Sequence, residues 1–351
     1  MSRRRGILQA LLSAALFGVA TPVSKRLLAD ISPQVLAGLF YLGAALFLFP
    51  TLLRSKSVGT RFGLPKDPRN RLYLLGAVFF GGILGPVLLL AGLQLAQAAS
   101  VSMLLNLETT ATAILALLLF REHLGRWAWL GNAGVVVAGV LLGLEGGQPG
   151  IIGSLLVAGA AIAWGLDNNL TALIDGITPA QSTFWKGLIA GLTNLAIGLM
   201  LMPSTPALPW VFALAVGGLS YGVSITLYIS SAQSLGATRS QMVFATSPFF
   251  GVAVALLWLG ESLSLVQVAA FALIALSLAV LFLDTHEHTH AHEPVEHAHS
   301  HRHDDGHHDH EHPGEPSSLR HSHEHDHEGQ VHAHPHWPDL HHRHSHGGDS
   351  S

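Results

Sequence analysis

Ten apolar stretches of roughly 20 residues dominate the first 283 residues of this 351-residue chain. A helix needs about 20 apolar residues to cross the hydrocarbon core of a bilayer. Only 11% of the residues are charged, whereas soluble domains carry about a quarter. We therefore expect an all-α integral membrane protein with ten transmembrane helices. The expected spans are 6–26, 33–53, 72–93, 98–120, 126–144, 151–173, 180–202, 208–230, 238–259 and 263–283.

An internal repeat divides this apolar region into two halves. Three residues of the first half have identical counterparts 139 residues later: Gln94 and Gln233, Met103 and Met242, and Glu122 and Glu261. A duplicated domain is the simplest cause, and internal repeats are typical of transporters that rock one half against the other. We expect five helices in residues 1–145, five in 146–283, and a separate tail at 284–351.

The positive residues of the short loops predict the orientation. With the N-terminus inside, the cytoplasmic side receives twelve Lys and Arg residues, and the outside receives only Lys25 and Arg26. Five spans per half is an odd number, so the two halves must have opposite orientations, which makes the repeat inverted. We expect a multi-pass protein of a bacterial-type inner membrane with both termini in the cytoplasm.

Two segments carry a family resemblance: LFREHLGRWAWLGNAGVVVAGVLL and LWLGESLSLVQVAAFALIALSLAVLF, each after a span that begins near AASVSMLL or GATRSQMVF. They resemble the EamA repeat of the drug/metabolite transporter superfamily, over about residues 6–283. The resemblance implies two inverted five-helix halves around a central cavity lined by the first four helices of each half. It does not identify the substrate, because that superfamily carries many solutes on one scaffold. One departure is Thr109 where the second half has Pro248, which predicts an asymmetric hinge.

Glu108 lies near the middle of the fourth expected span, within NLETT. An ionisable group at mid-bilayer costs roughly 2.5–3.5 kcal/mol, so it is a functional candidate by default. Its counterpart in the second half is Ser247. The carboxylate suits proton-coupled antiport or recognition of a cationic group, and the alternative is a structural Glu hydrogen-bonded to a neighbouring helix. The candidate substrate site also includes Asn106, Thr109 and Ser247.

A second polar run, Asp167, Asn168 and Asn169, lies deep in the sixth expected span after Trp164. Three consecutive side chains cover most of a helix circumference, so we expect at least one to face the cavity. The alternative is a helix that ends early and leaves the run near the cytoplasmic surface. These four residues complete the expected substrate site together with Lys186.

Other polar and aromatic residues of the spans have competing interpretations. For Lys186 we favour snorkelling of the ammonium to the interface over pairing with Asp167 or Glu108. Glu122 and Glu261 lie at helix-to-helix turns, where each is expected to cap the N-terminus of the next helix. The aromatic side chains could line a cavity for an organic solute, although packing is their commoner role; they are Trp164, Tyr221 and Tyr228.

The tail holds 23 of the 24 histidines, with 14 acidic and 3 basic residues. Imidazole and carboxylate groups bind Zn²⁺, Ni²⁺, Co²⁺ and Cu²⁺, and the scarcity of apolar residues predicts disorder. Matches to the H-E-x-x-H protease pattern arise by chance in such a sequence, and a pH sensor is a minor alternative. The candidate metal ligands are His286, His288, His290, His297, His299, His301, His323, His325 and His327.

The spans contain no constellation of nucleophile and base, so an enzyme is not expected, and no basic patch indicates nucleic acid binding. The leading hypothesis is a carrier that exports a small organic solute by alternating access, with a tail that binds or senses transition metals and no required cofactor. The alternatives are a transition-metal efflux carrier fed by the tail and a membrane-anchored metal store. The expected partners are the small-molecule substrate and the lipid bilayer, with proton coupling and a homodimer left open.

Overall fold

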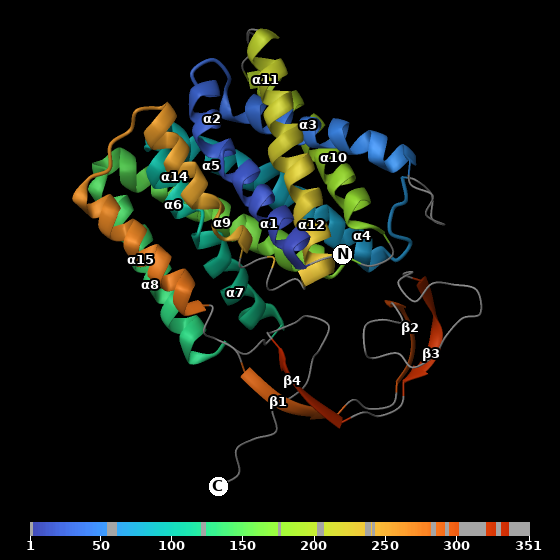
Figure 1. Cartoon of the computed structure of the whole chain (residues 1–351). Helices are drawn as coiled ribbons and strands as arrows, with labels where there is room; N and C mark the ends of the chain where they lie inside the picture. The colour runs from blue at the N-terminus through green and yellow to red at the C-terminus, as the bar shows by residue number, and fades with distance from the viewer. Residues whose placement is uncertain are drawn as a thin grey trace. The chain divides into compact units, whose positions relative to one another are not determined.

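In the computed structural model the chain divides into two units, Met1–Asp284 and Thr285–Ser351, and each is described by itself (Figure 1). The structure describes residues 3–54, 62–120, 124–174, 177–201, 207–235, 240 and 243–281 of the first unit, and residues 286–291, 295–301, 321–327 and 331–336 of the second.

The first unit is built of apolar helices. Within its described residues, eight helices or joined helices are long and apolar enough to cross a membrane, and two shorter apolar helices follow. This confirms the helical membrane class, while the count of ten spans stays a prediction. The elements are α1 (Arg3–Gly18), α2 (Ala20–Leu27), α3 (Pro33–Arg54), α4 (Pro68–Ala77), η1 (Val78–Leu84), α5 (Gly85–Leu95), α6 (Ala98–Leu104), α7 (Leu107–Phe120), α8 (Arg126–Glu145), α9 (Gly147–Ala172), α10 (Pro179–Leu201), α11 (Ala207–Gly217), η2 (Gly218–Val223), α12 (Ser224–Leu235), α14 (Ser247–Trp258) and α15 (Leu265–Leu281).

Two helices begin with a reciprocal capping box, in which a hydroxyl residue and a glutamine three positions later satisfy each other's backbone N–H groups. In α10 the Gln181 side chain accepts a hydrogen bond from the N–H of Thr178 at 2.8 Å. In α15 the Gln267 side chain accepts from the N–H of Ser264 at 2.9 Å, and the Ser264 hydroxyl accepts from the N–H of Gln267 at 3.1 Å. These caps fix the first turn of both helices.

Glycines bring the helix backbones of the core into contact. A Cβ atom added at Gly38 of α3 would lie 2.6 Å from the backbone nitrogen of Leu195 of α10. A Cβ added at Gly187 of α10 would lie 2.8 Å from the backbone oxygen of Tyr41 of α3. Without a hydrophobic driving force between helices in lipid, such small residues allow the close packing that holds a bundle together.

The contacts follow the duplication seen in the sequence. Helices at corresponding places of the two halves contact each other: α3 with α10, and α8 with α15, which lie side by side in Figure 1. Two further contacts form a matched pair: α5 contacts α9, and their counterparts α12 and α1 contact each other. Matched contacts of this kind are what a duplicated sequence predicts.

Two π-helical segments also correspond. η1 and η2 begin 140 residues apart and end 139 residues apart. A break in the helix likewise occurs at residues 105–106 and again, 140 residues later, at 245–246. The second break precedes Pro248 and the first has no proline, so the position of the break does not depend on the proline. The two helices are interrupted at corresponding positions, so the positions of the breaks do not show the asymmetry that we expected of the hinge.

The described residues of the second unit form four strands, in segments for which composition predicts disorder. They are β1 (His286–Ala291), β2 (Val295–His301), β3 (His321–His327) and β4 (Val331–His336). β1 pairs with β4 and β2 pairs with β3, both antiparallel. Histidine recurs at every second position of these segments, which is the side-chain period of a strand. The registers place histidine opposite histidine, as at His297 and His325 or His288 and His334.

The close approach of α3 to α10 leads to a stability prediction. Gly38→Ala forces a Cβ against the backbone of α10, so we expect it to lower the free energy of unfolding by about 1–3 kcal/mol, as overpacking does. Gly159→Ala is the matched control, because its added Cβ would meet only the flexible end of Leu88 at 3.3 Å. Unfolding in detergent followed by circular dichroism measures both, and equal stabilities would contradict the packing described.

Candidate functional site

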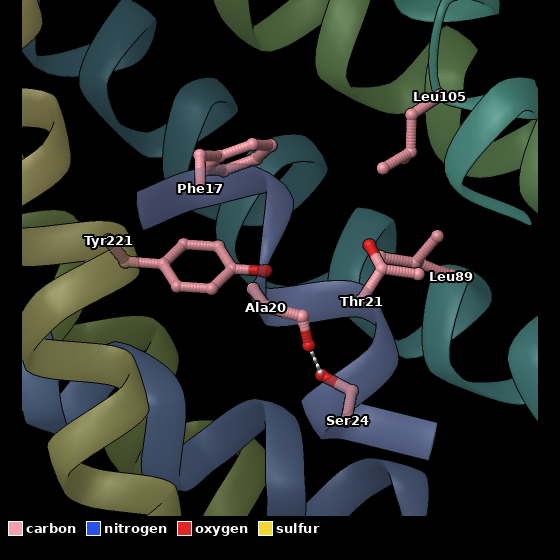
Figure 2. Close-up of a pocket in the computed structure, with 7 residues that line it drawn as sticks. All are labelled: Phe17, Ala20, Thr21, Ser24, Leu89, Leu105 and Tyr221. Carbon is pink, nitrogen blue, oxygen red and sulfur yellow. Dashed lines mark hydrogen bonds between the residues drawn. The ribbon is translucent and has the colours of Figure 1, made fainter. Parts of the chain in front are cut away.

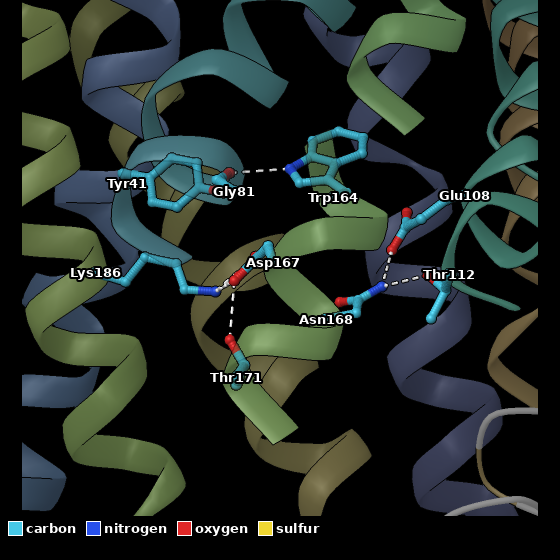
Figure 3. Close-up of polar contacts among 9 residues, drawn as sticks. All are labelled: Tyr41, Gly81, Glu108, Thr112, Trp164, Asp167, Asn168, Thr171 and Lys186. Atoms are coloured by element: carbon cyan, nitrogen blue, oxygen red, sulfur yellow. Dashed lines mark hydrogen bonds and ion pairs between the residues drawn. The ribbon is translucent and has the colours of Figure 1, made fainter. Parts of the chain in front are cut away.

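A glycine in the first π-helical segment is the centre of the candidate site. The backbone oxygen of Gly81 accepts hydrogen bonds from the hydroxyl of Tyr41 and, at 2.9 Å, from the indole nitrogen of Trp164 (Figure 3). A π-helical turn changes the hydrogen-bonding partners of the helix backbone and often marks a functional site. Here one carbonyl of η1 joins side chains of α3 and α9.

An ion pair lies beside this glycine. The ammonium of Lys186, on α10, is 2.6 Å and 2.7 Å from the two carboxylate oxygens of Asp167, on α9. The Thr171 hydroxyl donates a further hydrogen bond of 2.9 Å to the same carboxylate. A Cβ at Gly81 would collide with the Asp167 carboxylate, and one at Gly82 would lie 3.4 Å from the Lys186 side chain. Gly81 therefore makes the space that the Asp167 carboxylate occupies, and Gly82 lies beside the Lys186 side chain.

Glu108 belongs to a neighbouring polar cluster. Its carboxylate accepts a hydrogen bond of 2.9 Å from the Asn168 amide, which also lies 3.2 Å from the Thr112 hydroxyl (Figure 3). Asp167 is buried and Asn168 is exposed, so consecutive residues of α9 point to different surroundings. Of the three ionisable groups, Asp167 and Lys186 neutralise each other, and Glu108 adds a second carboxylate nearby.

The remaining residues of the expected substrate site are placed differently. Asn169 is buried, and its amide donates to the backbone oxygens of Gly165 at 2.7 Å and Thr112 at 3.2 Å, which ties α9 to α7. Asn106 is buried and donates to the backbone oxygen of Met103 at the helix break. Ser247 is also buried, at the first turn of α14. Thr109 is half-buried.

Several expectations need correction at this point. Lys186 pairs with Asp167, whereas we favoured snorkelling to the interface. Glu261 does cap a helix, but its carboxylate accepts from the N–H groups of Ala98 and Ala99 in the other half, both at 2.8 Å, rather than from the helix that follows it. Its sequence counterpart Glu122 lies outside the described residues.

Three participants were missing from the sequence interpretation: Tyr41, Thr112 and Thr171. A tyrosine or threonine in an apolar span is usually a packing residue, so neither type carried a usable signal. Gly81 and Gly82 are consecutive in their span, and this pair was a signal available in the sequence.

A small cavity lies between residues of α1, α2, α5 and η2. It has a volume of about 10 Å³ and is lined by Phe17, Ala20, Thr21, Ser24, Leu89, Leu105 and Tyr221 (Figure 2). The ring of Tyr221 also contacts that of Tyr41, with centroids 5.5 Å apart. Such a space suffices for about one water molecule, whereas sites for organic ligands measure about 300–1,000 Å³. The described helices are therefore closed together at this cavity.

No group of three or more histidine, aspartate or glutamate side chains that could hold a metal ion occurs among the described residues. The nine candidate histidine ligands of the tail lie on β1, β2 and β3, but their side chains are outside the described part of the structure. Metal binding by the tail therefore stays a prediction.

Comparison with known proteins gives consistent matches. The model of the EamA-like transporter family matches the chain twice, over residues 4–144 and 151–283. An uncharacterized transporter of Methanothermobacter thermautotrophicus is 28% identical over 286 residues, which is 76% of this chain and 83% of that protein. A protein of known crystal structure, 20% identical, superposes with a TM-score of 0.57 over 80% of this chain and 99% of its own.

The buried ion pair leads to a second prediction. Asp167→Asn or Lys186→Met leaves one charge without its partner, so we expect each to lower the free energy of unfolding by about 3 kcal/mol or more. The double variant removes both charges and should recover part of that loss. Lys66→Met is the control, since Lys66 is exposed in a loop. Detergent unfolding of the four variants measures the coupling, and strictly additive losses would show that the two charges do not interact.

Proposed function

Because the chain belongs to the EamA-like transporter family, we propose that it is a secondary carrier that exports a small organic metabolite by alternating access. The family assignment rests on the two matches of one family model, which together cover most of the chain. Membership of this family indicates membrane transport of a small molecule. The direction of transport, the coupling and the solute are proposals. A transporter of this kind needs no catalytic residue, in keeping with the lack of a nucleophile–base constellation in the spans.

We propose ten spans arranged as two inverted five-helix repeats. The double family match, the corresponding π-helical segments and the contacts between corresponding helices support the repeat. α14 and α15 supply the last two spans, after eight longer ones. An odd number of spans in each repeat makes them antiparallel, and the Lys and Arg bias of the loops favours both termini in the cytoplasm of a bacterial-type inner membrane.

The observation that carries this proposal is the ion pair of Asp167 and Lys186 together with the neighbouring polar cluster that contains Glu108. Charged groups within apolar spans are retained where they bind substrates, ions or protons. Both groups are held by α9, which contacts α7 and the π-helical segment η1. Asp167 and Lys186 already form an ion pair, so we assign to Glu108 the binding of a coupling proton or of a cationic group of the solute.

The experiment that tests the carrier is reconstitution in liposomes. Purified protein is given pooled amino acids and nucleosides, with Ni²⁺ and Zn²⁺ in separate assays, under an imposed proton gradient. We expect gradient-driven accumulation of an organic solute, and Glu108→Gln should lower its initial rate at least about tenfold, or about 1.4 kcal/mol. Asp30→Asn changes an exposed carboxylate outside the cluster and should leave the rate within about twofold.

Three outcomes distinguish an organic carrier from a metal carrier and separate the possible roles of Glu108. If no organic solute accumulates and Ni²⁺ or Zn²⁺ does, the metal efflux carrier replaces the proposal. If Glu108→Gln transports normally, Glu108 has no role in coupling or binding. If Glu108→Gln loses only the dependence on the gradient and keeps solute exchange, the coupling role is supported over the binding role.

The tail supports a second function, the binding or sensing of transition metals. The backbone register of β2 and β3 supports this proposal, because it places histidine opposite histidine, as at His297 and His325. Against a metal efflux carrier, the expected spans contain no histidine and no cysteine, so a soft metal would have only oxygen ligands there. We therefore propose an organic carrier whose tail gathers or senses metal ions.

Deletion of residues 285–351 tests this division. We expect the truncated carrier to keep solute transport within about twofold and to lose high-affinity Ni²⁺ and Zn²⁺ binding, because the candidate ligands all lie in the deleted segment. Isothermal titration with the metal ions and the liposome assay measure the two properties on the same preparations. Retention of metal binding would refute the tail site, and loss of all function would favour the membrane-anchored store.

A further inference from the structure

The turn between α5 and α6 is held by charged side chains from elsewhere in the chain. The last carbonyls of a helix and the first N–H groups of the next have no partner within their own helices. At the end of α5, the Lys25 ammonium donates to the backbone oxygens of Leu93 at 2.6 Å and Ala96 at 2.7 Å. At the start of α6, the two carboxylate oxygens of Glu261 accept from Ala98 and Ala99. One turn is thus clamped by an ammonium and a carboxylate.

A third side chain reinforces the contact. The Gln267 amide donates to the Gln97 side chain at 2.8 Å and to the Ser100 hydroxyl at 2.9 Å. The same amide is already oriented by its capping box with Ser264. Because its rotamer is fixed by the helix start, little conformational entropy is lost when it binds the turn.

The clamp joins two groups of helices. α9 contacts α5 and α7, whereas α1 contacts α12 and α14. Lys25 lies on α2, directly after α1, and Glu261 follows α14, so both come from the second group. The turn that they hold belongs to the first group. Contacts between α6 and α14, and between α2 and both α5 and α6, accompany the clamp at this end.

We propose that Lys25, Glu261 and Gln267 form a latch that closes the transport chamber at the α5–α6 turn and that must release before the chamber opens there. This inference rests on the proposed alternating access, in which the two groups of helices separate at one end at a time. The closed cavity bounded by Thr21, Leu89 and Leu105 lies between the same two groups.

The sequence makes the latch one-sided. At the repeat separation of 139 residues, Glu261 corresponds to Glu122, but Gln267 corresponds to Ala128 and Ser264 to Gly125. Lys25 lies 146–147 residues before Thr171 and Ala172, neither of which is cationic. The other end of the carrier can therefore repeat the carboxylate but neither the amide nor the ammonium. The latch biases the resting carrier toward closure at the α5–α6 turn.

Single-cysteine labelling tests the latch directly, because the native chain contains no cysteine. Thr21→Cys places a thiol in the closed cavity, and Asp30→Cys places one at an exposed position near α2 as a control for access of the reagent. A membrane-impermeant maleimide is added to intact proteoliposomes and to opened ones. We expect rapid reaction at position 30 and slow reaction at position 21 from the same side.

Latch variants should raise the reactivity at position 21. Glu261→Gln and Lys25→Met each remove hydrogen bonds to a charged group, so we expect labelling to accelerate about tenfold or more. Glu145→Gln is the matched control, since Glu145 is an exposed carboxylate at the end of α8, and it should not change the rate. Equal labelling rates in the parent, Glu261→Gln and Lys25→Met would overturn the latch.

A cross-link provides the converse test and does not depend on the stability of the charge variants. The Gln97 and Gln267 side chains meet end to end, so a bifunctional methanethiosulfonate reagent about as long as the two side chains should join Gln97→Cys to Gln267→Cys and hold the turn shut. A direct disulfide is not used, because it needs Cβ atoms about 3.5–4.5 Å apart. We expect the cross-link to stop labelling of position 21 and reduction to restore it, with Thr21→Cys alone as the control for reagent bound at that position; continued labelling of the cross-linked protein would overturn the proposal. Labelling requires no substrate, so a failed transport assay refutes the carrier and leaves the latch to this test.

Discussion

The requirement that every backbone polar group in lipid find a partner governs the candidate site. η1 presents the carbonyl of Gly81 to Tyr41 and Trp164, so one backbone oxygen connects α3, η1 and α9. The missing side chain at Gly81 leaves the space into which the Asp167 carboxylate fits. The position of the ion pair with Lys186 therefore depends on a glycine and on π-helical geometry as much as on the attraction between charges.

The fold class and the polar candidates could be predicted because they depend on local properties of the sequence. Apolar length identifies a span, and an ionisable residue within a span is conspicuous, which is how Glu108 and Asp167 were found. Partners on other helices depend on the rotation of each helix about its axis, which the nearly uniform apolar composition of these spans does not specify. For this reason the sequence could not decide between snorkelling of Lys186 and its pairing with Asp167.

Glu261, which lies at a turn, shows the same limit of prediction from the sequence. A carboxylate at the end of a helix predicts a cap, and Glu261 is one. The local pattern assigns it to the helix that follows, because only neighbours in sequence are visible. In the structure the two N–H groups of α6 are nearer to it in space although they lie more than 160 residues away. In the described strands of the tail histidine lies opposite histidine, and the alternation that sets this register is visible in the sequence.

The two carboxylates of the site have different requirements for closure of the helices. A buried pair of opposite charges offsets part of its desolvation cost by mutual attraction, whereas a single buried charge does not. Asp167 and Lys186 can therefore be enclosed without any bound solute. Glu108 accepts an amide hydrogen bond beside the exposed Asn168, and its full enclosure requires a proton or a cationic group. On the proposed mechanism the ion pair permits an empty carrier to close, and Glu108 makes complete closure depend on what it has bound.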